Sequence, residues 1–202
     1  MAAKKVRKRD GEGTRQAILR AATAEFIARG FHGARMEHIA ARAGVNKALV
    51  YRYYGNRDNL MREVLSRQIA RREAILAQIP DKLTDSLEVW YRETAAHGGD
   101  LIKLLQREAL DSDEVVVLLE RRRAYYEAQM AILRSWQEGG RVDEDFDVPY
   151  LFLALLALVG FPIGFPQLTR LVTDQEPDSP EFVRAWTKFL THLARWIDRK
   201  SD

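Results

Sequence analysis

Cations and aromatic hydroxyls gather between residues 35 and 57 of this 202-residue chain, with a spacing that suits contact with a polyanion. Lysine and arginine can meet phosphate oxygens or guanine edges, and a small residue beside them allows close approach to a groove. The residues that we single out for such contacts are Arg35, Arg42, Lys47, Ala48, Tyr51, Arg52, Tyr53 and Arg57. The alternative for each is a solvated helix face or packing in a core.

Catalytic and metal-binding chemistry finds no support in the sequence. Cysteine is absent, which excludes disulfides, thiolate zinc sites and thiol catalysis. The four histidines (His32, His38, His97 and His192) have no tight ligand spacing such as H-E-x-x-H. The sequence also has no motif of a Ser-His-Asp catalytic triad, of paired catalytic carboxylates or of a phosphate-binding loop. The alternative of a helical enzyme therefore lacks catalytic groups that would meet at one site. We predict a protein that is not an enzyme and needs neither metal nor cofactor.

The charge is distributed unevenly along the chain. Residues 1–60 hold 13 Lys and Arg against 5 Asp and Glu, a net charge of +8, whereas residues 61–202 have a net charge of −5. This split favours a polyanionic partner for the first third. Residues 1–13 are rich in Lys and Arg and lack the apolar region of a secretory signal peptide. We expect a flexible basic arm that lies along phosphates or enters a minor groove, or that touches nothing.

Helical periodicity and capping residues predict an all-α fold. Apolar residues recur at three- and four-residue intervals, and sustained alternation with hairpin turns is missing. Thr14, Asn46, Asn56 and Ser179 are candidate N-caps, and Gly30 is expected to end the first helix. The predicted helices cover residues 14–29, 36–43, 47–54, 57–79, 84–97, 100–110, 113–138, 149–161 and 180–199.

Two of these helices form a helix-turn-helix pattern. Residues 36–43 and 47–54 are short and amphipathic, and Gly44 between them supplies a permissive backbone. Ile39 and Val50 can pack the pair onto the first helix. The opposite face of the second short helix then shows its cations and Tyr51 to solvent, as is typical of a helix that enters a major groove.

The residues of this region closely resemble the DNA-binding domain of TetR-family transcriptional repressors. The resemblance covers residues 14–62 and rests on Thr14-Arg-Gln-Ala-Ile-Leu, Phe26, Gly30-Phe31, Met36-Glu-His-Ile39-Ala40, Ala43-Gly44-Val45-Asn46-Lys47, Val50-Tyr51-Arg52-Tyr53-Tyr54 and Leu60. It implies a homodimer that binds a palindromic operator and releases it when a small molecule enters the C-terminal domain. The implied domains are the arm at 1–13, a three-helix DNA-binding domain at 14–60, and a helical effector-binding and dimerisation domain at 61–202.

The resemblance also assigns roles to single residues. Lys47 and Ala48 match positions that approach bases or backbone, while Tyr51 and Tyr53 match aromatic residues that contact phosphate. Arg57 stands where the family has a cation that meets phosphate. The sequence departs from the family at two positions. Ala34-Arg35 replaces the usual small hydroxyl residue ahead of the second helix, so Arg35 could take over the DNA-backbone contact that a Thr hydroxyl makes in the family. Leu49 is bulkier than the frequent Thr or Ser, which could alter base preference.

The remaining residues resemble the family only in being helical. Ligand cavities between helices are mostly apolar, so we expect a hydrophobic or aromatic effector. The candidate pocket residues are Trp90, His97, Leu104, Tyr126, Met130 and Phe152, with Tyr91, Tyr125 and Trp136 beside them. The candidate dimer-interface residues are Leu155, Phe161, Phe182, Trp186, Phe189 and Leu193. The alternative for both sets is the ordinary core of one chain.

An uncharged segment, residues 148–169, requires a test for membrane insertion. A spanning helix needs about 20 predominantly apolar residues, and Pro162 and Pro166 interrupt the run here. We therefore predict a buried core helix, no membrane partner and a cytoplasmic protein. A membrane-associated adaptor is the alternative for this segment, and an activator or a nucleoid-binding protein is the alternative for the DNA-binding head.

Overall fold

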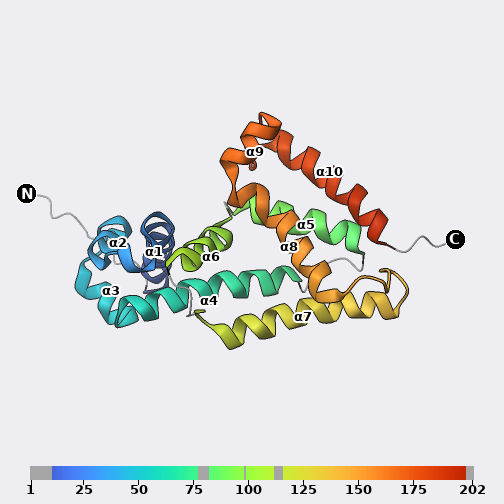
Figure 1. The fold of residues 1–202 in the computed structure, drawn as a ribbon. Coiled ribbons are helices and arrows are strands. Elements are labelled where there is room, and N and C mark those ends of the chain that lie inside the picture. Colours follow the sequence, from blue (N-terminus) through green and yellow to red (C-terminus); the bar gives the residue numbers. More distant parts are fainter. Residues whose placement is uncertain (1–10, 77–81, 98, 112–115, 199–202) are drawn as a thin grey trace, which may run out of the picture. The chain divides into compact units, whose positions relative to one another are not determined.

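The computed structural model describes residues 11–76, 82–97, 99–111 and 116–198, and over these residues the chain is built of α-helices without a named strand (Figure 1). The all-α prediction is confirmed. The helices are α1 (Gly11–Gly33), α2 (Met36–Ala43), α3 (Lys47–Tyr54), α4 (Arg57–Leu76), α5 (Leu83–Ala96), α6 (Asp100–Asp111), α7 (Leu119–Glu138), α8 (Val148–Gly164), α9 (Pro166–Thr173) and α10 (Pro180–Ile197).

The chain divides into two compact units, and two helices contribute residues to both. The first unit contains Met1–Arg67 and Leu104–Val117, and the second contains Gln68–Lys103 and Leu118–Asp202. The expected DNA-binding domain at 14–60 falls within the first unit, which also includes most of α6. Of the expected basic arm, residues 1–10 lie outside the described residues and residues 11–13 belong to α1.

Helix α1 forms the base of the first unit. Ile18, Ala22 and Phe26 are fully buried along one face, as their four-residue spacing predicts. The helix begins at Gly11, so Thr14 is a buried interior residue and its prediction as N-cap is wrong. Gly30 breaks the helix with φ 71° and ψ −179°, a conformation that only glycine adopts readily.

Side-chain caps begin three of the helices where the sequence predicts them. The Asn46 Oδ1 atom accepts a hydrogen bond from the Leu49 N–H at 2.8 Å at the start of α3. Asn56 does the same for Asn59 at 2.8 Å before α4. Ser179 accepts from the backbone of α10 at 3.2 Å. Each cap satisfies an N–H that has no partner within its own helix, and this local rule is why these starts could be predicted.

Two helix boundaries in the second unit differ from the prediction by more than one residue, and one helix is additional. Helix α7 begins at Leu119, since Leu118 adopts the left-handed conformation at φ 59°; part of the predicted start, residues 113–115, lies outside the described residues. Helix α8 continues through Pro162 to Gly164. An additional helix, α9, follows because Pro166 is well suited to a first helical turn. The predicted ends at residues 79 and 199 lie outside the described residues.

The core of the second unit is formed chiefly by α5, α8 and α10, with α7 beside α8 (Figure 1). Leu87, Tyr91, Leu155 and Leu190 are almost fully buried within it. Among the described helices, none alone is long and apolar enough to cross a membrane, and α8 and α9 reach that length only as a pair bent by 86°.

Candidate DNA-binding surface and effector cavity

The helix-turn-helix is fixed to α1 by buried contacts. Gly44 ends α2 in the left-handed conformation at φ 67°, and the Val45 N–H donates to the Ala40 carbonyl at 3.0 Å. Ile39 and Val50 are completely buried. The Tyr54 hydroxyl donates to the Arg15 carbonyl of α1 at 3.3 Å. These contacts hold α3 in one orientation, which is what a recognition helix requires.

The outer face of α3 carries the predicted contact residues. Lys47, Ala48, Tyr51 and Arg52 are all exposed. The Lys47 ammonium lies 5.5 Å from the centroid of the Tyr51 ring and forms an ion pair with Glu37 of α2. Their hydrogen bond raises the pKa of Lys47 and lowers the pKa of Glu37, so both side chains stay charged. A phosphate that binds Lys47 would therefore compete with the Glu37 carboxylate.

The remaining predicted cations near α3 are held against the backbone or a ring. The Arg52 guanidinium carbon lies 6.0 Å from the centroid of the Tyr53 ring. Tyr53 donates its hydroxyl to the Gly11 carbonyl at 3.4 Å. Arg57 donates from Nη1 to the His32 carbonyl at 3.1 Å, beyond the break in α1. These contacts restrict the side chains while leaving polar atoms available at the surface.

Sequence reasoning missed a buried carboxylate that organises the corner between α1 and α2. Glu25 is only 3% exposed, and its Oε1 lies 3.0 Å from Nδ1 of His38 and 3.8 Å from Nε of Arg29. Its only sequence signal is its place on the buried face of α1, one residue before Phe26.

The two predicted cations that flank α2 are both exposed. Arg35 precedes α2 without a side-chain capping bond, and Arg42 lies in the last turn of α2.

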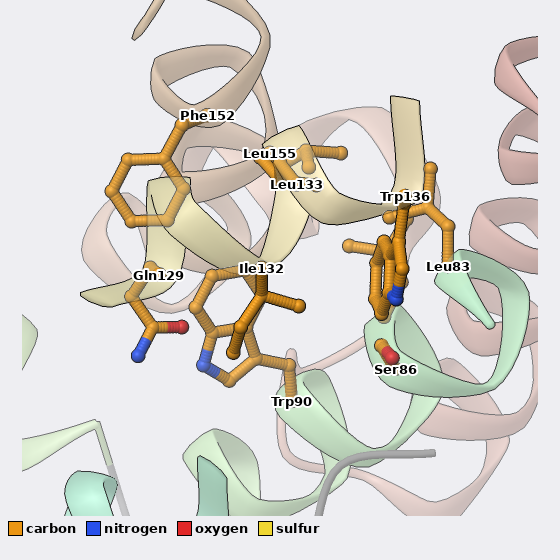
Figure 2. Close-up of a pocket in the computed structure, with 10 residues that line it drawn as sticks. Leu83, Ser86, Trp90, Gln129, Ile132, Leu133, Trp136, Phe152 and Leu155 are labelled. Atoms are coloured by element: carbon orange, nitrogen blue, oxygen red, sulfur yellow. The ribbon is translucent and has the colours of Figure 1, made fainter. Parts of the chain in front are cut away.

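The second unit contains an apolar cavity of about 30 Å³ between α5, α7 and α8 (Figure 2). Two predicted pocket residues, Trp90 and Phe152, line it, and so does Trp136. The full lining is Leu83, Ser86, Leu87, Trp90, Gln129, Ile132, Leu133, Trp136, Phe152 and Leu155. We call this space the apolar cavity; its volume holds one or two water molecules.

Gln129 and Ser86 are the polar residues in this otherwise apolar and aromatic lining, and Gln129 differs in its hydrogen bonding. Its side chain is buried, with the residue 4% exposed, and its Nε2 atom has no hydrogen-bond partner among the described residues. A buried amide that lacks a partner is costly, so the position favours a ligand oxygen or a water. Gln129 shares the buried stripe of α7 with Tyr125, Leu133 and Trp136, and that four-residue spacing was the available sequence signal.

Trp90 also lines a second cavity, of about 20 Å³, which we call the polar cavity. The predicted pocket residue His97 lies here, with its Nδ1 2.7 Å from the Glu93 carbonyl oxygen. The lining is Gln68, Arg71, Arg72, Ile75, Trp90, Glu93, Thr94, His97, Gly99, Asp100 and Leu101. The two cavities thus share one aromatic wall and differ sharply in polarity.

The other predicted pocket residues lie outside both linings. Tyr126 and Met130 are partly buried and pack against the core of the second unit. Tyr91 is buried in that core. Tyr125 is buried on the inward stripe of α7. Leu104 is completely buried but belongs to the first unit.

The predicted interface residues divide between the core and the surface. Leu155 and Phe182 are buried in the core of their own chain, so neither presents a surface to a partner. Trp186 and Leu193 are partly buried. Phe161 and Phe189 are about half exposed. Trp196, which the helical spacing places on the same face of the last helix, is 87% exposed. Sequence reasoning missed further exposed apolar residues, namely Tyr150, Leu153, Phe165, Leu168, Leu171 and Val172.

Comparisons with known proteins agree with this geometry. The family model of bacterial regulatory proteins, tetR family, matches residues 18–64. The HTH-type transcriptional repressor SCO4008 of Streptomyces coelicolor is 32% identical over 165 residues, which span 81% of this chain and 85% of that repressor. The solved structure of transcriptional regulator SCO4942, also from S. coelicolor, has a TM-score of 0.74 at 24% identity and covers 89% of this chain and 97% of its own.

A second solved structure is the transcriptional regulator FadR of Bacillus subtilis in complex with stearoyl-CoA. It has a TM-score of 0.65 at 17% identity, over 89% of this chain and 97% of its own. At this identity the likeness shows the fold alone. The family match and the repressor relative go further: the chain belongs to the TetR family of helix-turn-helix transcriptional repressors.

Proposed function

We propose that this repressor binds a palindromic operator as a homodimer, with α3 of each subunit in the major groove. The observation that carries the proposal is the exposed cationic and aromatic face of α3, which is held rigidly on α1. Lys47 would meet phosphate or a base edge, and Ala48 would allow the helix to approach closely. Two-fold symmetry requires the two recognition helices to stand about 34–36 Å apart or a multiple of that distance.

Other predicted residues would position the head on the duplex. Tyr51 would donate its hydroxyl to a phosphate oxygen, and Tyr53 would do the same by exchanging the Gly11 carbonyl for a phosphate oxygen. Arg57 would contact a phosphate at the start of α4. Arg35, Arg42 and Arg52 would add further backbone contacts. Phosphate contacts of this kind set register and make the affinity depend on salt, but they carry no sequence information themselves.

Exposed apolar stripes on α8 and α10 support the homodimer. On α8 the stripe contains Tyr150, Leu153 and Phe161, and on α10 it contains Phe189 and Trp196. Trp196 is 87% exposed, an unusual position for so large an apolar side chain. Burial of these stripes against a second copy would remove them from water. We therefore place Phe161 and Phe189 in the proposed interface. Leu155 and Phe182 would not contact the partner, and they pack in the core beneath the two stripes.

A small hydrophobic or aromatic effector would bind at the apolar cavity and release the operator. Its aromatic lining and the unpartnered Gln129 amide support this, since a ligand oxygen could accept from Nε2. The likeness in fold to FadR, solved in complex with stearoyl-CoA, is consistent with the binding of a ligand. A ligand can weaken operator binding only by its difference in affinity between the free and the DNA-bound conformations.

Fluorescence anisotropy with duplexes from upstream of its own gene and of any divergent neighbour tests the operator. We expect tight binding to a fragment that contains an inverted repeat, with two chains per repeat, and weaker binding when one half-site is scrambled. Absence of preference for any duplex over scrambled DNA would reject the operator, and one chain per site would reject the dimer. Lipophilic aromatic compounds added to the complex then test release.

Light scattering tests the interface. Phe189→Glu, in the proposed interface, is expected to reduce the mass from that of two chains to that of one. Leu171→Glu is the matched control, since Leu171 is 82% exposed on α9, outside the two stripes. A wild-type protein with the mass of one chain, or a Phe189→Glu variant that remains a dimer, would contradict the assignment.

A further inference from the structure

Arg72 is a partly buried cation with no ion-pair partner among the residues that the structure describes. Its side chain lines the polar cavity and donates from Nη2 to the Thr94 hydroxyl at 3.4 Å. Among the described residues, no carboxylate lies within 4 Å of its guanidinium. Burial lowers the pKa of Arg72, although a guanidinium remains protonated at neutral pH.

The acids that line the same cavity lie near other side chains. The Glu93 Oε2 atom lies 3.6 Å from Nδ1 of His97. Burial raises the pKa of Asp100, and the charges acting against that rise are those of Lys103, Arg71 and His97. Neither carboxylate therefore neutralises Arg72. A buried charge without a partner is destabilising, so its presence calls for an anion that joins it from outside.

One aromatic side chain is common to the linings of the polar cavity and the apolar cavity. Trp90 lines both cavities. The centroid of its ring lies 6.0 Å from the centroid of the Phe152 ring, and the two ring planes are inclined by 31°. The cavities together hold only a few water molecules, so a ligand must displace the Trp90 ring to enter. A molecule that did so would place an apolar body beside Phe152 and could extend an acidic end to Arg72.

We propose that the effector is an apolar monocarboxylic acid whose carboxylate pairs with Arg72 while its hydrophobic body occupies the apolar cavity beside Trp90 and Phe152. The inference rests on the effector response proposed above and names the chemical class of the effector. Arginine presents two parallel N–H donors to a carboxylate, which makes the contact strong and selective for an acid over a neutral analogue. The Thr94 hydroxyl accepts from the guanidinium and helps to hold it in place.

Isothermal titration calorimetry with 2-naphthoate and decanoate, each compared with its neutral amide, tests this class. We expect the wild-type protein to bind at least one acid at least tenfold more tightly than the matching amide. In Arg72→Met the ratio falls to within twofold while the amide still binds. Arg71→Met is the matched control, since Arg71 lines the same cavity from the same helix but is exposed, and it should keep at least a fivefold preference.

Thermal unfolding of the unliganded variants separates a lost contact from a lost fold. Replacing an unpaired buried charge by an apolar side chain is expected to leave the midpoint unchanged or to raise it in Arg72→Met. The proposal is overturned if the wild type binds neither acid, if it binds acids and amides equally, or if Arg72→Met keeps the preference for the acid.

Calorimetry and thermal unfolding use no DNA, so their results do not depend on operator binding. Adding the same acids to the operator complex in the anisotropy assay tests the effector response separately. If the acids bind through Arg72 but leave the operator complex intact, the effector response fails while the ligand class stands. If the protein binds its operator and neither acid, the ligand class fails and the operator proposal stands.

Discussion

The indole N–H of Trp186 in α10 donates a hydrogen bond at 3.2 Å to the carbonyl oxygen of Leu158 in α8. That carbonyl stands four residues before Pro162, which lies inside the helix and has no N–H to donate. The indole therefore supplies the donor that proline removes. Helix α8 can contain an internal proline because α10 satisfies the exposed backbone acceptor.

Trp186→Phe should lower the free energy of unfolding by about 1–3 kcal/mol, because the Leu158 carbonyl then lacks its donor. The loss should shrink when Pro162→Ala is present, since an alanine N–H can bond to the residue four positions earlier. Urea unfolding of the wild type, both single variants and the double variant measures this coupling. Strictly additive effects of the two substitutions would contradict the relationship.

Lys47→Glu should weaken binding to every DNA sequence and flatten the salt dependence. If Lys47 contacts a phosphate, losing it should reduce the slope of log K against log salt by about 1. Anisotropy titrations between low and physiological salt measure both quantities. Lys188→Glu, an equal change of charge on the exposed surface of α10, is the control and should leave the slope near that of the wild type. Unchanged operator affinity for Lys47→Glu would remove this residue from the contact surface.

Gly30→Ala should destabilise the first unit. Its backbone conformation costs a residue with a side chain about 1–3 kcal/mol. The added Cβ would also lie 2.5 Å from Oδ2 of Asp111, the carboxylate that accepts the Phe31 N–H. Gly33→Ala is the matched control, because its Cβ meets only an ordinary contact at 3.5 Å and should change stability by less than about 0.5 kcal/mol. Equal unfolding midpoints for the two variants would show that the break at Gly30 is not needed.

Stability should fall in alkaline solution through Tyr91. Its hydroxyl donates to the Pro177 carbonyl at 2.9 Å, and burial raises the pKa of Tyr91 well above its usual value, with Asp178 adding to the effect. The unfolded chain therefore loses this proton first, so the contribution of Tyr91 is complete below about pH 10 and declines as the pH rises further.

Tyr91→Phe should cost about 1 kcal/mol at pH 7 through the lost hydrogen bond. Above pH 10 it should reduce the slope of unfolding free energy by at most about 1.4 kcal/mol per pH unit, the value for one proton. Urea unfolding at several pH values from 7 to 11 measures both. Parallel curves for variant and wild type would mean that another group governs the alkaline loss.

Local signals explain which parts of the fold could be predicted. The bounds of α2 and α3 follow from Gly44, Gly55 and the Asn46 cap, all of which act within one helical turn. The extension of α8 to Gly164 could not be predicted, because Pro162 is typical of a helix end when the indole donor on another helix is unknown. The sequence pattern could indicate only that the segment was too short and interrupted to span a membrane.

The features of the sites that the sequence could not predict depend on contacts with other helices or with another subunit. Lys47 and Arg52 could be selected because helix periodicity alone places them outward. Arg72 looks like any other cation in the basic run of α4, and only the arrangement of α5 and α7 beside it reveals that it lacks a carboxylate. Leu155 and Phe182 were assigned to an interface because apolar spacing cannot distinguish a core face from a partner face.

Helix α6 completes the end of α1 from 80 residues further along the chain. The Arg107 Nε atom donates to the Ile27 carbonyl at 2.8 Å, and the Asp111 carboxylate accepts from Phe31 just after the break. A fragment cut after residue 67 would leave both backbone groups without these partners and would expose the face that Leu104 covers. The smallest piece of this repressor able to fold as an autonomous head is thus discontinuous in sequence, and excising it requires a linker that joins residue 67 to residue 104.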